Sequence, residues 1–222
     1  MTGSTPTASD LVWYASYGSN LSTDRLLCYL RGGRPEGAAR TYSGSRDGAP
    51  PRASVPLTLP GRIYFAGRST AWGGGMAFYD PLAPGPTPSR AHLVTIEQFA
   101  DIAAQERDEE PRPDGPVEDA LRDPGLLAAD GADHLCGDGL YARLLRVATI
   151  DGLPVLTFTA THAIDDVPHV APTEPYLAMI SRGLAESHGW STDEARGYLD
   201  TRVGHRDDGC SVTPHAGRAA PM

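Results

Sequence analysis

The sequence is poor in cysteine and in positive charge, and each shortage excludes a class of protein. Its 222 residues include only Cys28, Cys136 and Cys210, an odd number at wide spacings. This pattern indicates neither a disulfide framework nor a zinc site, and a reducing cytoplasm is the expected compartment. Because 28 Asp and Glu outnumber 19 Lys and Arg, the formal net charge is −9. A general nucleic-acid binder needs a basic surface, so we expect no nucleic-acid partner.

Long apolar runs are also missing. No segment approaches the length of a membrane span, and the N-terminal MTGSTPTASD has neither the basic end nor the apolar centre of a signal peptide. We therefore expect a soluble, cytoplasmic protein with no membrane partner. The 25 Gly and 20 Pro favour many turns over a long helical bundle.

The length suits one domain, which we place at residues 11–204. Residues 1–10 and 205–222 are expected to be disordered ends. Residues 107–137 are acidic and rich in proline, and we expect them to form a loosely ordered surface insertion with a short helix at VEDALRD.

Strand patterns predominate early in the chain and helical patterns interleave later. The predicted strands are Leu11–Tyr17, Arg62–Ala66, Gly75–Tyr79, His92–Ile96, Leu140–Ile150 and Pro154–Ala160. The predicted helices are Thr23–Leu30, Ile96 to about Arg107, Pro175–His188 and Thr192–Arg202. Asp151-Gly152 predicts a tight hairpin turn between the last two strands. The predicted class is α+β, with a mixed, mainly antiparallel sheet or barrel.

A compact polar turn follows the first predicted strand in VWYASYGSNL. Gly18 allows a backbone conformation closed to other residues, Ser19 and Asn20 have short polar side chains, and Ser22 can cap the next helix. Such a strand, turn and helix start directs several backbone N–H groups to one place, where the helix dipole helps to bind a carboxylate. The alternative is a turn that only connects two elements.

A carboxylate lies on the apolar stripe of the predicted helix in TIEQFADIAAQE. Thr95 and Gln98 form a capping box, and Glu106 is four residues after Ile102 and seven after Phe99. Desolvation of a carboxylate on a core-facing stripe raises its pKa towards the range useful for general acid/base catalysis. The alternative is that the helix frays before Pro111 and leaves Glu106 in solvent.

These residues resemble the γ-glutamylcyclotransferase family. The most specific feature is Tyr17-Gly18-Ser19-Asn20-Leu21, followed by a helix start with Arg25. Further similar segments are Trp72-Gly73-Gly74-Gly75, the unit that ends in Ala104-Gln105-Glu106, Leu140-Tyr141, and Ala171 to Tyr176. The resemblance extends from about residue 12 to 189, and it implies a mainly antiparallel β-barrel or strongly curved sheet flanked by helices.

The resemblance implies an enzyme that needs no cofactor or metal and that cleaves a γ-glutamyl amide. The substrate's α-amine attacks its own γ-carbonyl, which releases 5-oxoproline and a free amine or amino acid. Glu106 is the implied catalytic acid/base, and the implied substrate-binding residues are Tyr17, Gly18, Ser19, Asn20, Leu21, Tyr141 and Tyr176. A homodimer is compatible with the family.

Two other functions remain open. One is a non-catalytic γ-glutamyl or amino-acid binding protein, or an interaction module, on the same fold. The other is an amide hydrolase that delivers water and releases glutamate. Within the family, γ-glutamyl amino acids, γ-glutamyl amines, glutathione and γ-glutamylated biosynthetic intermediates are all substrates. The insertion after Glu106 is placed where such choices are made.

Overall fold

The computed structural model describes residue 7 and residues 10–203. The predicted disordered ends fall outside these residues, except for Thr7 and Asp10. Within them the strands form a six-stranded sheet in the order β2-β5-β1-β8-β7-β6 and a separate two-stranded sheet, β3-β4. The strands are β1 Leu11–Ser16, β2 Ala53–Pro60, β3 Arg62–Ala66, β4 Met76–Asp80, β5 Pro86–Thr95, β6 Asp133–Leu135, β7 Arg143–Ile150 and β8 Leu153–Thr159.

The predicted α+β class is confirmed, and the sheet is mixed and mostly antiparallel. Only β1 and β8 run parallel, and the other pairs are antiparallel. The barrel alternative is wrong for the described residues, because the six-stranded sheet is open and β3-β4 forms a sheet of its own.

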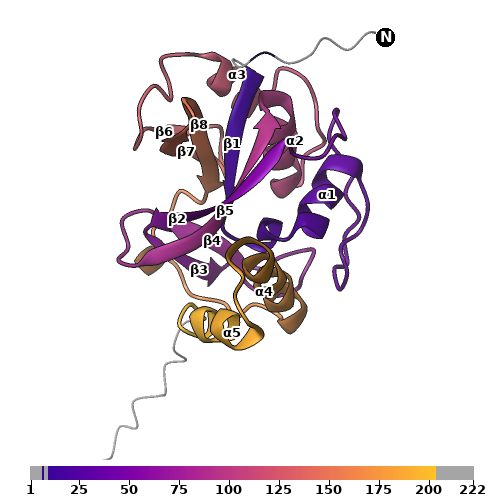
Figure 1. Ribbon diagram of the computed structural model, residues 1–222, viewed down its shortest axis with the longest axis vertical. Coiled ribbons are helices and arrows are strands. Elements are labelled where there is room, and N and C mark those ends of the chain that lie inside the picture. Colours follow the sequence, from indigo (N-terminus) through magenta and orange to yellow (C-terminus); the bar gives the residue numbers. More distant parts are fainter. Residues whose placement is uncertain (1–6, 8–9, 204–222) are drawn as a thin grey trace, which may run out of the picture.

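Five α-helices pack around the strands of the described chain (Figure 1). They are α1 Thr23–Arg31, α2 Ile96–Glu106, α3 Pro116–Arg122, α4 Glu174–His188 and α5 Thr192–Asp200, with short 3-10 helices η2 Ser19–Leu21 and η3 Ile164–Asp166. In Figure 1, α1 and α2 lie on one side of β1, whereas α4 and α5 lie together beside β3 and β4. None of the described helices is both long and apolar enough to cross a bilayer.

Strand β1 occupies the centre of the fold and contributes to two cores. Tyr14 packs into the first, where its ring centroid lies 5.5 Å from that of Phe99 and 5.3 Å from that of Phe158. Trp13 and Ala15 belong to the second core, which includes Ile180 of α4. Because alternate residues of a strand point to opposite faces, both faces of β1 are covered and its sequence is almost continuously apolar.

Most local turn and cap signals correspond to the structure, and Ser22 at the start of α1 is the exception described below. The β7-β8 hairpin turns at Asp151 and Gly152, whose φ angles are 51° and 77°. Both hydrogen bonds of the capping box are present at Thr95, and both are present at Ser191. The predicted helices end within two residues of the observed helices. Strands β2 and β6 were not predicted, and β7 begins at Arg143 rather than at Leu140.

The insertion at residues 107–137 lies mostly at the surface, but it packs on the domain more closely than its composition predicts. The predicted short helix is present as α3, and β6 pairs with β7. Val117 and Leu127 are buried in the first core. Arg46 donates to Asp101 of α2 and, over 2.7 Å, to Glu118 of α3. The insertion is therefore fastened to the domain by apolar packing and by ion pairs.

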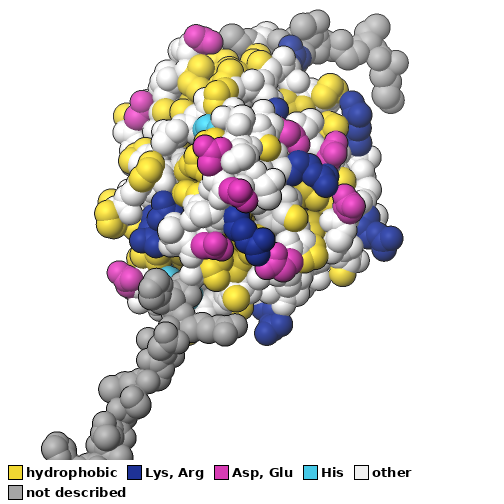
Figure 2. All heavy atoms as spheres, turned by 60° about the horizontal axis from the view of Figure 1, so that its bottom comes forward, with side chains coloured by type: hydrophobic (Ala, Val, Ile, Leu, Met, Phe, Trp, Pro, Cys, Tyr) yellow, Lys and Arg dark blue, Asp and Glu magenta, His cyan; other side chains and the backbone are white. Residues whose placement is uncertain are grey.

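One outer face carries both signs of charge. Figure 2 shows acidic and basic side chains interspersed over the face that includes α4 and α5, without a patch of a single sign. This distribution is typical of a solvated surface.

Candidate functional site

The turn after β1 presents backbone donors, as the sequence predicts. Residues 19–21 form η2, in which the N–H groups of Leu21 and Ser22 donate to the carbonyls of Gly18 and Ser19. Within the described residues, the N–H groups of Gly18, Ser19 and Asn20 have no acceptor. Three neighbouring donors are therefore free at the start of the turn.

His92 and Arg90 of β5 contact backbone carbonyl groups of this turn. The Nε2 atom of His92 lies 3.1 Å from the carbonyl oxygen of Asn20, and its Nδ1 atom lies 2.8 Å from the hydroxyl of Ser54. Burial, with a smaller contribution from Arg90, lowers the pKa of His92 to about 3, so the ring is neutral. We assign the tautomer in which Nε2–H donates to Asn20 and Ser54 donates to Nδ1. Arg90 donates to the carbonyl of Leu21 over 2.9 Å.

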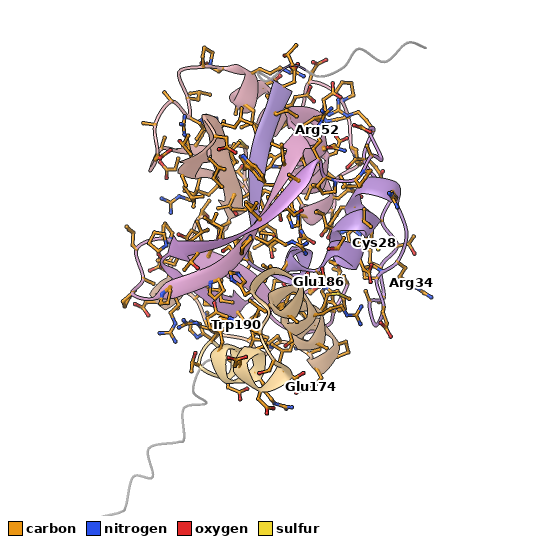
Figure 3. The ribbon with its side chains drawn as sticks, in the orientation of Figure 1. Cys28, Arg34, Arg52, Glu174, Glu186 and Trp190 are labelled. Carbon is orange, nitrogen blue, oxygen red and sulfur yellow. The ribbon has the colours of Figure 1, made fainter. Side chains whose placement is uncertain are left out.

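Ser22 does not cap α1 in the way the sequence predicts. It occupies the N-cap position, but its hydroxyl donates to Glu186 of α4 over 3.3 Å. The N–H of Thr23 also donates to Glu186, over 2.9 Å, and Arg90 pairs with the same carboxylate. Glu186, labelled in Figure 3, therefore supplies the acceptor at the start of α1 from another helix.

Glu106 is the last residue of α2, so this helix does not fray before it. Its half-buried carboxylate accepts a hydrogen bond of 3.0 Å from the side-chain amide of Asn20. The same amide donates to the hydroxyl of Tyr14, also over 3.0 Å. The pKa of Tyr29 lies well above its usual value because the ring is buried and because its hydroxyl interacts with Glu106. Tyr29 is therefore a neutral hydrogen-bond donor beside this carboxylate.

Three tyrosines that were expected to bind substrate line one cavity, and two of them, Tyr141 and Tyr176, contact Ala77. The hydroxyl of Tyr141 donates to the carbonyl of Ala77 over 2.9 Å, and the N–H of Ala77 lies 3.3 Å from the hydroxyl oxygen of Tyr176. The hydroxyl of Tyr17 donates to the carbonyl of Phe158 over 2.8 Å. Burial raises the pKa of all three tyrosines, so they are neutral. The protons of Tyr17 and Tyr141 are engaged by the backbone, and the rings form an aromatic wall.

The Trp72 to Gly75 segment completes this wall. The ring centroid of Trp72 lies 5.3 Å from that of Tyr176. A Cβ atom on Gly74 would lie 2.8 Å from the carbonyl oxygen of Ala171, and one on Gly75 would overlap the carbonyl of Val170. Only glycine therefore allows the two backbone segments to approach this closely.

A cavity of about 350 Å³ brings these elements together. It is lined by all but one of the residues singled out from the sequence: Tyr17, Gly18, Ser19, Asn20, Glu106, Tyr141 and Tyr176. The exception is Leu21, which is fully buried and packs against Gly183 of α4. Leu21 thus anchors the turn and does not line the cavity.

Several further residues line the cavity that sequence reasoning did not assign to the site, although Arg25, Trp72 and Gln105 lie in segments that resemble the family. They include Arg25, Tyr29, Tyr42, Trp72, Gln105 and Arg107. Arg25 and Tyr29 are four residues apart on α1, so they share one face of this helix, and they lie beside the apolar Leu26 and Leu30. This spacing is the sequence signal that indicates an inward-facing pair. Asp108 and Glu109 also line the cavity and pair with Arg40 and Arg107 respectively. The first residues of the insertion therefore form part of the cavity wall.

The cavity supplies a carboxylate, free backbone donors and neutral hydroxyls, which suits proton transfer and anion binding. In the described part of the chain, no group of three or more His, Cys, Asp and Glu side chains is arranged to hold a metal ion.

Comparison with known proteins gives few relatives. No family model matches the chain. It is 34% identical over 205 residues to histone deacetylase 5 of Arabidopsis thaliana, in an alignment that covers 86% of this chain. The chain spans only 31% of the length of that relative.

Two solved structures are compared with this chain. A γ-glutamyl cyclotransferase is 15% identical, with a TM-score of 0.47, over 89% of this chain and 90% of that one. An uncharacterized protein from Homo sapiens has the same identity and TM-score over 92% and 94% of the two chains. Because both TM-scores are below 0.5, the functional assignment depends on the geometry of the cavity alone.

Proposed function

We propose that the protein is a cyclotransferase that cleaves a γ-glutamyl amide and releases 5-oxoproline. The observation that carries this proposal is the hydrogen bond between Asn20 and Glu106, which joins the donor-rich turn to a carboxylate in one cavity. The N–H groups of Gly18, Ser19 and Asn20 bind the α-carboxylate of the glutamyl group. The aromatic wall of Tyr17, Tyr141 and Tyr176 folds the glutamyl chain towards Glu106.

The reaction requires no nucleophile from the protein. Glu106 removes a proton from the α-ammonium, and the amine nitrogen then attacks the γ-carbonyl carbon to close a five-membered lactam. As the tetrahedral intermediate collapses, the bond from the γ-carbon to the leaving nitrogen breaks, and Glu106 returns its proton to that nitrogen. The ring nitrogen loses its second proton to the same amine, which therefore leaves as an ammonium ion. All atoms are conserved and no water is consumed. Neutral Tyr29, which interacts with Glu106, orients this carboxylate.

The experiment is mass-spectrometric detection of 5-oxoproline from a panel of γ-glutamyl amino acids, glutathione, γ-glutamyl-lysine and γ-glutamyl amines. We expect the wild type to form 5-oxoproline from at least one of these compounds and Glu106→Gln to form almost none. The matched control is Glu97→Gln, because Glu97 lies on the same helix but is exposed and outside the cavity. This control should retain full activity.

Other products would lead to other conclusions. Free glutamate in place of 5-oxoproline identifies a hydrolase, because intramolecular attack cannot release glutamate directly. If the folded wild type binds panel members but transforms none of them, the protein is a binding module, and Glu106→Gln should then leave its output intact.

A further inference from the structure

Arg25 is a buried cation without hydrogen-bond acceptors. It belongs to α1, is only 2% exposed, and lines the cavity that contains Glu106. Its Nε and Nη1 atoms are buried and have no partner, and within the described residues no hydrogen bond or ion pair of its guanidinium is found. Arginine is always charged and has five N–H donors. A buried guanidinium without acceptors is costly, so this position calls for an explanation.

Neighbouring aromatic rings account for part of the environment of Arg25. Its Cζ atom lies 4.0 Å from the ring centroid of Tyr29 and 4.3 Å from that of Tyr42. The faces of these rings attract the cation electrostatically. They do not replace the oxygen acceptors that the N–H groups of Arg25 lack. Burial lowers the pKa of Arg25, but Tyr29, Tyr42 and Glu106 together raise it by more. Within the described residues Arg25 and Glu106 form no ion pair. The guanidinium is thus held in place and left without a counter-ion.

Other arginines of the described chain have acceptors although they are more exposed than Arg25. Arg46 contacts both Asp101 and Glu118, and Arg90 contacts Leu21, Thr23 and Glu186. Among the described residues, Arg62, Arg107 and Arg202 each also have a buried nitrogen without a partner, and of these three Arg107 lines the cavity. However, Arg107 already pairs with Glu109 through Nε and Nη2. Arg25 is therefore the better candidate for binding an anion.

We infer that Arg25 binds a carboxylate on the leaving part of the substrate. This inference depends on the proposed function, in which the N–H groups of Gly18, Ser19 and Asn20 bind the α-carboxylate of the glutamyl group. A second anion site in the same cavity then selects substrates with two carboxylates. Guanidinium and carboxylate groups are complementary in shape and charge. The cavity consequently favours a γ-glutamyl amino acid or peptide with a free terminal carboxylate over a γ-glutamyl amine.

The test compares γ-glutamyl-alanine with γ-glutamyl-alaninamide, which differ only in the terminal carboxylate. For the wild type we expect kcat/KM for 5-oxoproline formation to be roughly 30- to 100-fold higher with the carboxylate, as for a charge-assisted hydrogen bond in a partly desolvated site. Equal values for the two compounds would overturn the inference, and this comparison needs no variant.

Substitution of Arg25 assigns the preference to this side chain. In Arg25→Gln the ratio of kcat/KM for the two compounds should fall to within about threefold, whatever the absolute rates, and circular dichroism verifies that the variant is folded. In Arg25→Lys, which keeps the charge but loses the planar fork, an intermediate preference is expected. A preference that survives Arg25→Gln but disappears in Arg107→Gln would assign the site to Arg107 and overturn the inference.

Calorimetric titration separates this inference from the proposed reaction. We expect the chemically inactive Glu106→Gln variant to bind γ-glutamyl-alanine more tightly than the alaninamide compound, and Glu106→Gln/Arg25→Gln to bind the two alike. If the wild type forms no 5-oxoproline while this difference in binding is seen, the reaction is wrong and the anion site stands. If Glu106→Gln binds both compounds equally, or neither, the anion site is wrong.

Discussion

The side-chain amide of Asn20 lies 3.0 Å from the carboxylate of Glu106 and 3.0 Å from the hydroxyl of Tyr14. One amide group therefore connects the turn after β1, the end of α2 and the first core. The position of the proposed catalytic carboxylate depends on a contact between residues that are 86 positions apart in the sequence.

Loss of this amide should impair the reaction more than the fold. We expect Asn20→Ala to lower kcat for 5-oxoproline formation by about 10- to 100-fold, because Glu106 loses the donor that orients it. Tyr14→Phe is the matched control, since it removes the other acceptor of the same amide and leaves the bond to Glu106. Its kcat should stay within about threefold of the wild type. A wild-type rate in Asn20→Ala would show that this bond does not orient the carboxylate.

The insertion should contribute to global stability. Leu127 is 8% exposed and packs in the first core, whereas the adjacent Leu126 is 38% exposed. Leu127→Ala should reduce the free energy of unfolding by about 2–4 kcal/mol, and Leu126→Ala by under about 1 kcal/mol. Denaturant titration of both variants measures this difference. Similar small losses of the free energy of unfolding in the two variants would show that the insertion adds little to global stability, as its composition predicts.

His92 should make stability depend on pH between about 5 and 6.5. Its pKa is lowered from 6.5 to about 3 in the folded protein, so between these values the unfolded chain binds more protons than the native one. Stability contributed by neutral His92 is full above pH 6.5 and is lost as the pH falls towards 3. For one such group, the loss between pH 6.5 and 5 is roughly 1.5 kcal/mol.

Denaturant titrations at several pH values test this contribution. His92→Gln keeps a donor near the carbonyl of Asn20 but cannot titrate, so the slope of its unfolding free energy against pH should be smaller in this window. Equal slopes in the wild type and the variant would mean that His92 takes up a proton in the native state at an ordinary pKa.

Two glycines of the Trp72 to Gly75 segment should respond differently to the same substitution. A Cβ atom on Gly75 would overlap the backbone of Val170, whereas one on Gly73 meets nothing within 4 Å. Gly73 has a φ of 82°, so Gly73→Ala should cost only about 1 kcal/mol from backbone strain. Gly75→Ala should cost more than about 3 kcal/mol, because two backbone segments must separate. Thermal unfolding compares the two, and equal shifts would contradict the close approach.

Short-range patterns predicted the elements that carry the proposed site. The apolar stripe and capping box of α2 place Glu106 on the inner face, and the hairpin at Asp151 follows from local turn chemistry. The same reasoning missed β2, whose sequence ASVPLTLP contains two prolines. Proline is tolerated there because β2 is an edge strand of the sheet.

Contacts between distant segments could not be predicted in this way. The spacing of Arg25 and Tyr29 places both on one face of α1, but no local pattern shows that Tyr42, which lies outside any helix or strand, covers Arg25. Likewise, the acidic composition of the insertion predicts exposure, whereas Arg46 from another loop holds Glu118 in a buried position. In both cases tertiary packing overrides composition, and one sequence does not reveal the partner.

The central place of β1 also determines when the cavity can exist during synthesis. Trp13 and Tyr14 pair with Val155 and Leu156 of β8, and Tyr176 of α4 completes the wall beside the turn. A nascent chain therefore exposes the turn and Glu106 long before the segments that enclose them leave the ribosome. Incomplete translation products that end before α4 therefore lack the assembled cavity. Any activity that is measured then comes from chains that include α4.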